Sequence, residues 1–124
     1  MDIRFNGDSG TNYSWKQLYG TGSSTGSNSG SSTTGVFVGD ENDAGTTASI
    51  FDNREIYIPN YAGSSNKSVL ADSVRENNAT SATNQIHTGL WSNTPPITSI
   101  TLVDEAGATF AQYTSATLYG IRKY

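Results

Sequence analysis

The chain has 124 residues, a formal net charge of -4 and a pI near 4.6, and just under half of it is Ser, Thr, Asn or Gly. The acidic balance argues against a nucleic-acid partner, because nucleic-acid binders carry clustered basic residues. The lack of Cys excludes disulfides and thiol chemistry. No segment approaches the roughly 20 apolar residues of a membrane span, so we also expect no membrane partner.

Apolar residues recur at period two, in short runs separated by turn-forming clusters, which predicts an all-β fold. We expect a jelly-roll-like antiparallel β-sandwich of about eight strands. Residues 1–124 should form a single domain, because a chain of this length suits one hydrophobic core. The predicted strands span residues 2–5, 13–19, 35–39, 54–58, 67–76, 85–91, 97–103 and 115–121, with 46–51 as a further candidate.

The segment 13–19 alternates between an aromatic face, which we expect to be buried, and a more polar one. Its aromatic face consists of Tyr13, Trp15, Gln17 and Tyr19. The stretch at 21–35, TGSSTGSNSGSSTTG, has no charge and no side chain larger than Asn. Only 20 residues precede it, too few for an independent domain. We therefore predict a mobile Ser/Gly-rich loop at 21–35, at one edge of the sandwich, and not a linker between domains.

His87 is the only histidine, so a Ser/His/Asp triad would have to use it and a His-rich metal site is impossible. On the strand predicted over 85–91 it shares a face with Gly89 and Trp91. A histidine that faces solvent or a subunit contact is favoured over a catalytic base. No GxSxG, phosphate-loop or HExxH motif occurs.

The acidic turn GDENDAG, with Asp40, Glu41 and Asp43, suggests calcium but fails the EF-hand pattern. Ala44 holds the fifth position of the loop, and Phe51 stands where the twelfth-position Glu belongs. A solvated acidic turn is therefore favoured over a metal site. Glycosidase chemistry would need two carboxylates at a defined separation, and no spacing among the acidic residues nominates a pair.

Aromatic residues near Asn and Asp are also a pattern of sugar-binding β-sandwiches, since a ring stacks on the apolar face of a sugar while amides and carboxylates bind its hydroxyls. In a chain with only 34% hydrophobic residues, the same rings are needed for the core. Burial is favoured over a ligand platform. The candidates are Tyr13, Trp15, Tyr19, Tyr61 and Trp91.

Four stretches occur in a characteristic order: IRFNGDSGTNYSWKQLYG, EIYIPNYAGSSNKSVLADSVRENNAT, GLWSNTPPITSITLVDEAG and FAQYTSATLYGIRKY. In this order they resemble a family of tailed-bacteriophage virion proteins, often labelled as capsid, decoration or tail-fibre components. The resemblance covers nearly the whole chain. Its motifs, such as IPNYAGS-NKS and ATLYGI, are strand and turn patterns without catalytic logic. Members of that family are longer, with further strands upstream of the segment similar to residues 2–5, so we expect an open sheet edge here.

The resemblance implies a non-enzymatic virion structural protein, a capsid decoration or fibre component assembled in the host cytoplasm. It would form a symmetric oligomer, expected to be a homotrimer, in contact with other virion proteins and without a cofactor. The alternative is a carbohydrate-binding module that recognises a host surface glycan. That module would use Tyr13, Trp15, Tyr19 or Trp91 as its stacking platforms.

Overall fold

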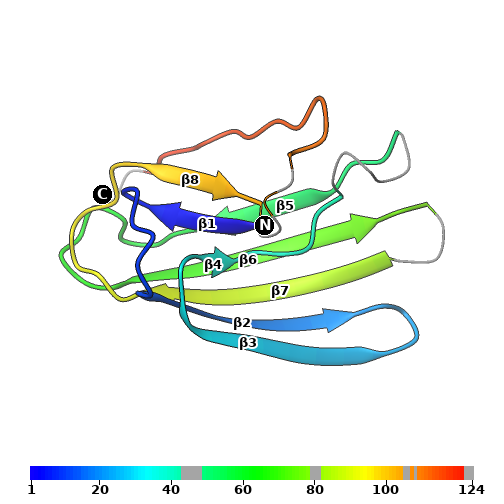
Figure 1. The fold of residues 1–124 in the computed structure, drawn as a ribbon, viewed down its shortest axis with the longest axis horizontal. Coiled ribbons are helices and arrows are strands. Elements are labelled where there is room, and N and C mark those ends of the chain that lie inside the picture. The colour runs from blue at the N-terminus through cyan, green and yellow to red at the C-terminus, as the bar shows by residue number, and fades with distance from the viewer. Residues whose placement is uncertain (43–48, 79–81, 105–106, 108, 122–124) are drawn as a thin grey trace.

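The computed structural model describes residues 1–42, 49–78, 82–104, 107 and 109–121. Over these ranges the chain is all-β, as predicted, and two antiparallel sheets face each other (Figure 1). None of the described residues lies in a helix that could cross a membrane. The strands are β1 (Asp2–Phe5), β2 (Tyr13–Gly20), β3 (Thr25–Thr33), β4 (Val36–Phe37), β5 (Asn53–Tyr57), β6 (Lys67–Glu76), β7 (Ala82–Trp91) and β8 (Ile100–Val103).

The small sheet has the order β4-β1-β8 and the large sheet the order β3-β2-β7-β6-β5. Strand β1 pairs with β8 and β2 pairs with β7, so strands from the two halves of the chain pair in nested fashion, as in a jelly roll. The remaining pairs of the large sheet, β2–β3, β5–β6 and β6–β7, join neighbours along the chain. The small sheet has three strands and the large sheet five, so the small sheet cannot cover the whole inner face of the large one.

Alternation along the strands explains the core between the sheets. In β6, every second residue from Lys67 to Ser73 is buried and the residues between them are exposed, the period expected of a strand with one covered face. Strand β1 buries Ile3 and Phe5 in the same way. The apolar core consists of Met1, Ile3, Phe5, Tyr13, Val36, Val38, Val69, Ala71, Trp91 and Ile97.

The prediction of a loop over the Ser/Gly-rich stretch is wrong for residues 25–33. They form β3, an edge strand that pairs with β2 from Tyr13↔Thr33 to Gly20↔Thr25. Only residues 21–24 turn between the two strands, and Thr21 N donates to Ser24 O at 2.9 Å. The stretch is therefore the second arm of a β-hairpin.

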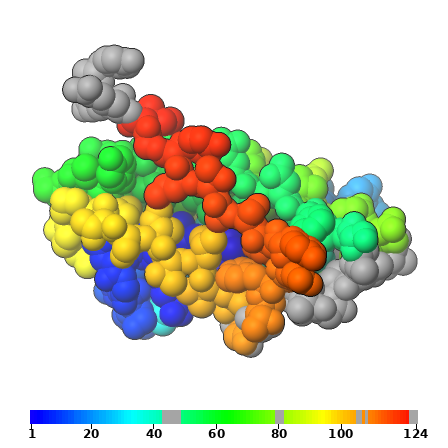
Figure 2. Space-filling model, turned by 90° about the horizontal axis from the view of Figure 1, so that it is seen from above, coloured from blue at the N-terminus to red at the C-terminus, as the bar shows by residue number. Residues whose placement is uncertain are grey.

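The strand predicted over 115–121 is also absent: these residues have no regular structure, and Leu118, Tyr119 and Ile121 are 78–82% exposed. The space-filling view shows this part of the chain, coloured red, on the molecular surface (Figure 2). Of the candidate strand 46–51, residues 46–48 lie outside the described residues and 49–51 are not in a strand.

The packing of the two sheets yields a first prediction, at Gly89 of β7. A Cβ atom at this position would lie 2.2 Å from Cγ1 of Val36 in the opposite sheet. We expect Gly89→Ala to destabilise the protein by about 1–3 kcal/mol through overpacking, measured by urea unfolding. The control is Gly20→Ala, where a Cβ would lie 4.0 Å from its nearest atoms, in Ser24 and Thr25, and which should change stability by less than about 0.5 kcal/mol. Adding Val36→Ala should recover part of the loss, and equal stability of Gly89→Ala and wild type would contradict this packing.

Candidate functional site

Of the five aromatic candidates, Tyr61 is half-exposed between β5 and β6, and the other four form two pairs. Tyr13 and Trp91 belong to the core: each is 1% exposed, and their rings stack with centroids 6.3 Å apart. The Tyr13 hydroxyl donates to the carbonyl of Asp8 at 3.0 Å and accepts the Phe5 N–H at 3.1 Å. These two rings have no free face for a ligand.

Asp8 fixes the buried indole of Trp91. Trp91 Nε1 donates to Asp8 Oδ2 at 2.8 Å, and this hydrogen bond is the main reason why the pKa of Asp8 lies below its usual value, followed by the bond from the Gly10 N–H. Burial raises the pKa of the Tyr13 hydroxyl. Both aromatic residues thus have polar partners inside the fold, as buried Tyr and Trp side chains require.

Trp15 and Tyr19, by contrast, are half-buried and line a hollow of about 240 Å³. The hollow lies where the inner face of β2, β3 and β7 meets β4 and the residues that follow it. The side chains that line it are aromatic rings and polar groups, and neither Lys nor Arg is among them. The lining residues are Trp15, Gln17, Tyr19, Asn28, Phe37, Asp40, Thr83 and Gln85.

The glycines of β3 make room for these two rings. A Cβ at Gly26 would lie 2.5 Å from the Tyr19 ring, and one at Gly30 would lie 2.5 Å from Trp15 Nε1. Because real side chains do not approach so closely, the rings lie over β3 only where it has no side chain. The Trp15 ring also contacts Phe37 of β4, with centroids 5.1 Å apart.

Two pairs of polar side chains border the rings. Asn28 Nδ2 donates to Gln17 Oε1 at 3.0 Å, across the β2–β3 pair. Gln85 Nε2 donates to Asp40 Oδ2 at 2.6 Å and to Thr83 Oγ1 at 3.1 Å, while the Asp40 N–H donates back to Gln85 Oε1 at 3.2 Å. The reciprocal bonds fix the Gln85 amide, and with it the position of the Asp40 carboxylate.

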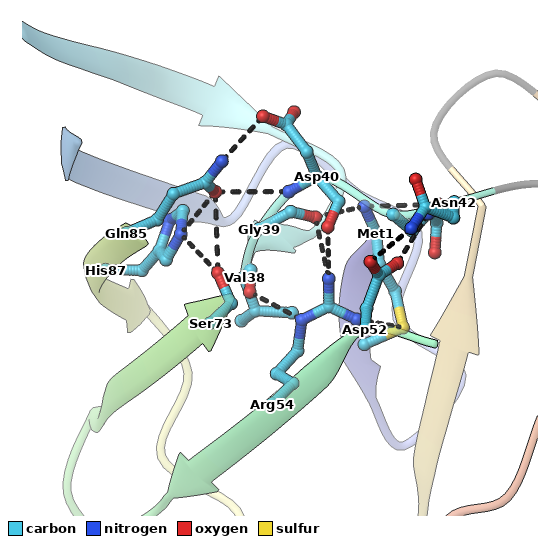
Figure 3. A network of polar contacts seen from close by, with 11 residues as sticks. Met1, Val38, Gly39, Asp40, Asn42, Asp52, Arg54, Ser73, Gln85 and His87 are labelled. Atoms are coloured by element: carbon cyan, nitrogen blue, oxygen red, sulfur yellow. Dashed lines mark hydrogen bonds and ion pairs between the residues drawn. The ribbon is translucent and has the colours of Figure 1, made fainter. Parts of the chain in front are cut away.

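His87 lies beneath this network and not at the surface, so the expectation of a solvent-facing or subunit-contact histidine is wrong (Figure 3). It is 1% exposed, its ring packs edge-on against Phe37 at 5.2 Å, and its Nε2 lies 3.1 Å from Gln85 Oε1. Since that oxygen only accepts hydrogen bonds, Nε2 carries the proton. Burial, and then the charge of Arg54, lower the pKa of His87 to about 4, so the ring is neutral at pH 7.

Arg54 of β5 holds the segment that follows β4. Its guanidinium donates to the carbonyls of Val38 at 2.9 Å, Gly39 at 3.2 Å and Asp40 at 2.6 Å. Gly39 adopts φ +125°, and a Cβ there would lie 2.3 Å from Ser73 Oγ, so only glycine fits this turn. Nothing in the sequence singles out Arg54. Its role follows from the side-chain geometry of the folded chain alone.

The acidic turn behaves differently from the predicted solvated turn. Asp40 bonds to Gln85 as described, and Glu41, whose side chain is 14% exposed, pairs with the Met1 ammonium at 3.3 Å. Burial is the largest cause of the raised pKa of Glu41. Asp43 lies outside the described residues. In the part of the chain that the structure describes, no three His, Asp or Glu side chains form a group suited to a metal ion.

A second candidate surface covers the outer face of the large sheet. There, an outer apolar patch, defined here as Leu18, Leu70, Val74, Ile86 and Leu90, has side chains that are 37–62% exposed. Leu18 and Ile86 are direct partners across β2 and β7, and the same row continues to Asp72 and Glu55. Several exposed apolar side chains on one sheet face mark an interaction surface more often than scattered ones do.

The chain was compared with protein-family models, with curated proteins and with solved structures, and none of them matches it.

Proposed function

We propose that this protein is a non-enzymatic structural component of a tailed-bacteriophage virion, a capsid decoration or fibre subunit that assembles as a symmetric oligomer. The four sequence stretches that resemble such proteins support the virion assignment, and the two-layered all-β fold agrees with the sandwich that the resemblance implies. Its partners are other copies of itself and other virion proteins.

The proposal of self-assembly rests on the exposed C-terminal segment, residues 115–121. It alternates like a strand, with Thr117, Tyr119 and Ile121 on one side and Leu118 on the other. Yet its three large apolar side chains are about four-fifths exposed. Within the described residues no strand pairs with this segment, so its apolar side chains are available to pack on a neighbouring subunit.

The outer apolar patch offers a matching surface on a second copy. The patch is flanked by Glu55 and Asp72, which lie side by side on β5 and β6, and the C-terminal segment is followed in sequence by Arg122 and Lys123. Apolar groups and opposite charges thus complement each other. Because the segment of one copy contacts a different surface of the next, the contact is heterologous, and such contacts form a ring where the rotation between subunits closes. The family resemblance implies a ring of three subunits.

Light scattering coupled to size-exclusion chromatography tests the assembly. The wild-type chain should elute as a closed oligomer over a dilution series. Burying a Leu or Ile side chain contributes about 1.5–3 kcal/mol, so the double variant Leu118→Asp/Ile121→Asp should weaken association by more than about a hundredfold and give monomers. Ile86→Asp should have the same effect from the other side of the contact.

The control for this experiment is Tyr61→Asp, since Tyr61 is 49% exposed but belongs neither to the C-terminal segment nor to the outer apolar patch. It should leave the oligomer intact, and circular dichroism should show the same fold in all variants. A wild-type chain that stays monomeric at every concentration would refute the assembly. Mass spectrometry of purified virions tests the virion assignment separately, because a structural component must occur there in stoichiometric amount.

A further inference from the structure

We propose that the hollow beside β4 is a binding site for one ring of a neutral carbohydrate. The inference goes beyond the assembly role and does not depend on it, because the hollow lies on the inner face of the large sheet beside β4, whereas the proposed contact uses the outer face of the large sheet and the C-terminal segment. It selects Trp15 and Tyr19 from the four aromatic candidates and adds polar residues that the sequence did not nominate.

The position and size of the hollow suit a single sugar ring. The small sheet ends at β4, and among the described residues no strand of that sheet lies beyond β4 to cover the inner face of β2 and β3 (Figure 1). The resulting hollow of about 240 Å³ is smaller than the roughly 300–1,000 Å³ of sites for drug-sized ligands. Trp15, Tyr19 and Phe37 supply apolar walls on which the C–H face of a sugar can pack.

Three polar groups at the hollow have hydrogen-bonding capacity left. Gln17 uses its Oε1 for Asn28, and Asp40 uses its Oδ2 for Gln85. Gln17 Nε2, Asn28 Oδ1 and Asp40 Oδ1 have no partner among the described residues. Gln17 is 5% exposed, Asp40 is half-buried and Asn28 is exposed, and none of the three atoms is among the fully buried unpaired atoms of the described residues, which are Glu41 Oε2 and His87 Nδ1. One amide donor and two oxygen acceptors therefore remain for sugar hydroxyls.

The charges at the site select a neutral ligand. Asp40 is the one carboxylic acid among the residues that line the hollow, and no Lys or Arg is among them. A carboxylate accepts hydrogen bonds from two hydroxyls but repels an anionic sugar. The site should therefore bind neutral hexoses or N-acetylhexosamines and reject uronic and sialic acids.

The layer beneath the site holds it in place before a ligand arrives. Gln85 Oε1 accepts from the Asp40 N–H, from His87 Nε2 and, at 3.4 Å, from Ser73 Oγ, and Arg54 fixes the carbonyls of the same segment (Figure 3). A polar group oriented by packing and by further hydrogen bonds loses little freedom on binding. The buried network of His87, Gln85 and Ser73 thus orients the turn that carries the Asp40 carboxylate.

Nuclear magnetic resonance titration of the full chain tests the proposal. The probes are methyl glycosides of neutral hexoses and N-acetylhexosamines, with a methyl glucuronide and a sialoside as anionic controls, all at millimolar concentration. We expect saturable shifts of the Tyr19, Asn28 and Asp40 amides with a neutral probe and none with the anionic probes. Tyr19→Ala and Asn28→Ala should each weaken binding about tenfold, whereas Tyr61→Ala should have no effect.

Two results would overturn the proposal. One is a set of titrations in which no neutral probe shifts the three amides of the folded wild-type chain, or in which the anionic probes bind as well. The other is a Tyr19→Ala variant that changes the oligomeric mass but binds sugar like the wild type. That result would show that Tyr19 contacts a neighbouring copy of the chain and not a sugar. Thermal unfolding of each variant verifies that a loss of binding is not caused by a loss of folding.

The variant Asp40→Asn keeps the shape of the side chain but removes its charge. It should therefore bind the anionic probes that the wild type rejects.

Discussion

Trp91→Ala should destabilise the protein by about 3–5 kcal/mol, the usual cost of truncating a large buried aromatic side chain. Trp91 is 1% exposed and contacts Phe5 at 5.5 Å and Tyr13 at 6.3 Å between ring centroids. The substitution also leaves Asp8 without its indole partner. Urea unfolding followed by far-UV circular dichroism measures the free energy of unfolding.

The matched variant Trp91→Phe separates the two contributions. It keeps an aromatic ring in the core but removes the indole N–H, so it should cost less than Trp91→Ala and still more than a surface substitution. Tyr19→Ala, at a half-buried ring beside the hollow, should be milder than Trp91→Ala. A loss of less than about 1 kcal/mol for Trp91→Ala would contradict the assignment of Trp91 to the core and return it to the candidates for a ligand platform.

The alternation of apolar residues was sufficient to predict most strands. The strand at 67–76 was predicted with the bounds of β6, and those at 2–5 and 13–19 match β1 and β2 to within one residue. Each of these strands buries one face against the core, so apolar residues recur at period two along it, and this alternation is visible in the sequence. The aromatic face of 13–19 is the inner face of β2, as expected, although Trp15 and Tyr19 are only half-buried.

The Ser/Gly-rich strand was missed because β3 has almost no intrinsic β-propensity. Its inward positions are Gly26, Asn28 and Gly30, opposite Tyr19, Gln17 and Trp15 of β2. The small residues are there because large rings on the neighbouring strand need the space. Tertiary packing thus overrides local preference, and the only signal in the sequence was the spacing of two glycines four residues apart.

The segment 115–121 shows the opposite error. Its sequence reads as a strand, but a strand is stable only with a hydrogen-bonded neighbour, and the described part of the chain provides none. The alternation of apolar residues shows that a segment can form a strand, but whether it does so depends on a neighbouring strand with which it can pair. The same reasoning leads from this exposed segment to the proposed contact with a second subunit.

The site itself was only partly predictable. The aromatic candidates were chosen by residue type, which does not distinguish Tyr13 and Trp91 in the core from Trp15 and Tyr19 at the hollow. Gln17, Asn28 and Asp40 meet through pairings between strands and a turn, and no spacing along the chain records this. For His87, the face it shares with Trp91 was a usable signal, because a face that buries a tryptophan faces the core.

Stability should fall by about 2 kcal/mol between pH 7 and pH 4.5 through His87 alone. The folded-state pKa of His87 is about 4, compared with 6.5 for an ordinary histidine, first because the ring is buried and then because Arg54 is nearby. Between these two values the unfolded chain binds a proton that the folded chain does not. Stability is therefore retained above pH 6.5 and is lost progressively as the pH falls toward 4.

The variant His87→Gln isolates this effect, since His87 is the only histidine and Gln keeps a donor for Gln85. Urea unfolding of both proteins from pH 7 to pH 4.5 should give curves that converge as the pH falls, because only the wild type loses the histidine contribution. Glu41, whose raised pKa favours the folded state at low pH, acts in both proteins and cancels in the difference. Parallel curves would mean that His87 is protonated equally in the folded and unfolded chains, and hence that the layer under Asp40 is open to water.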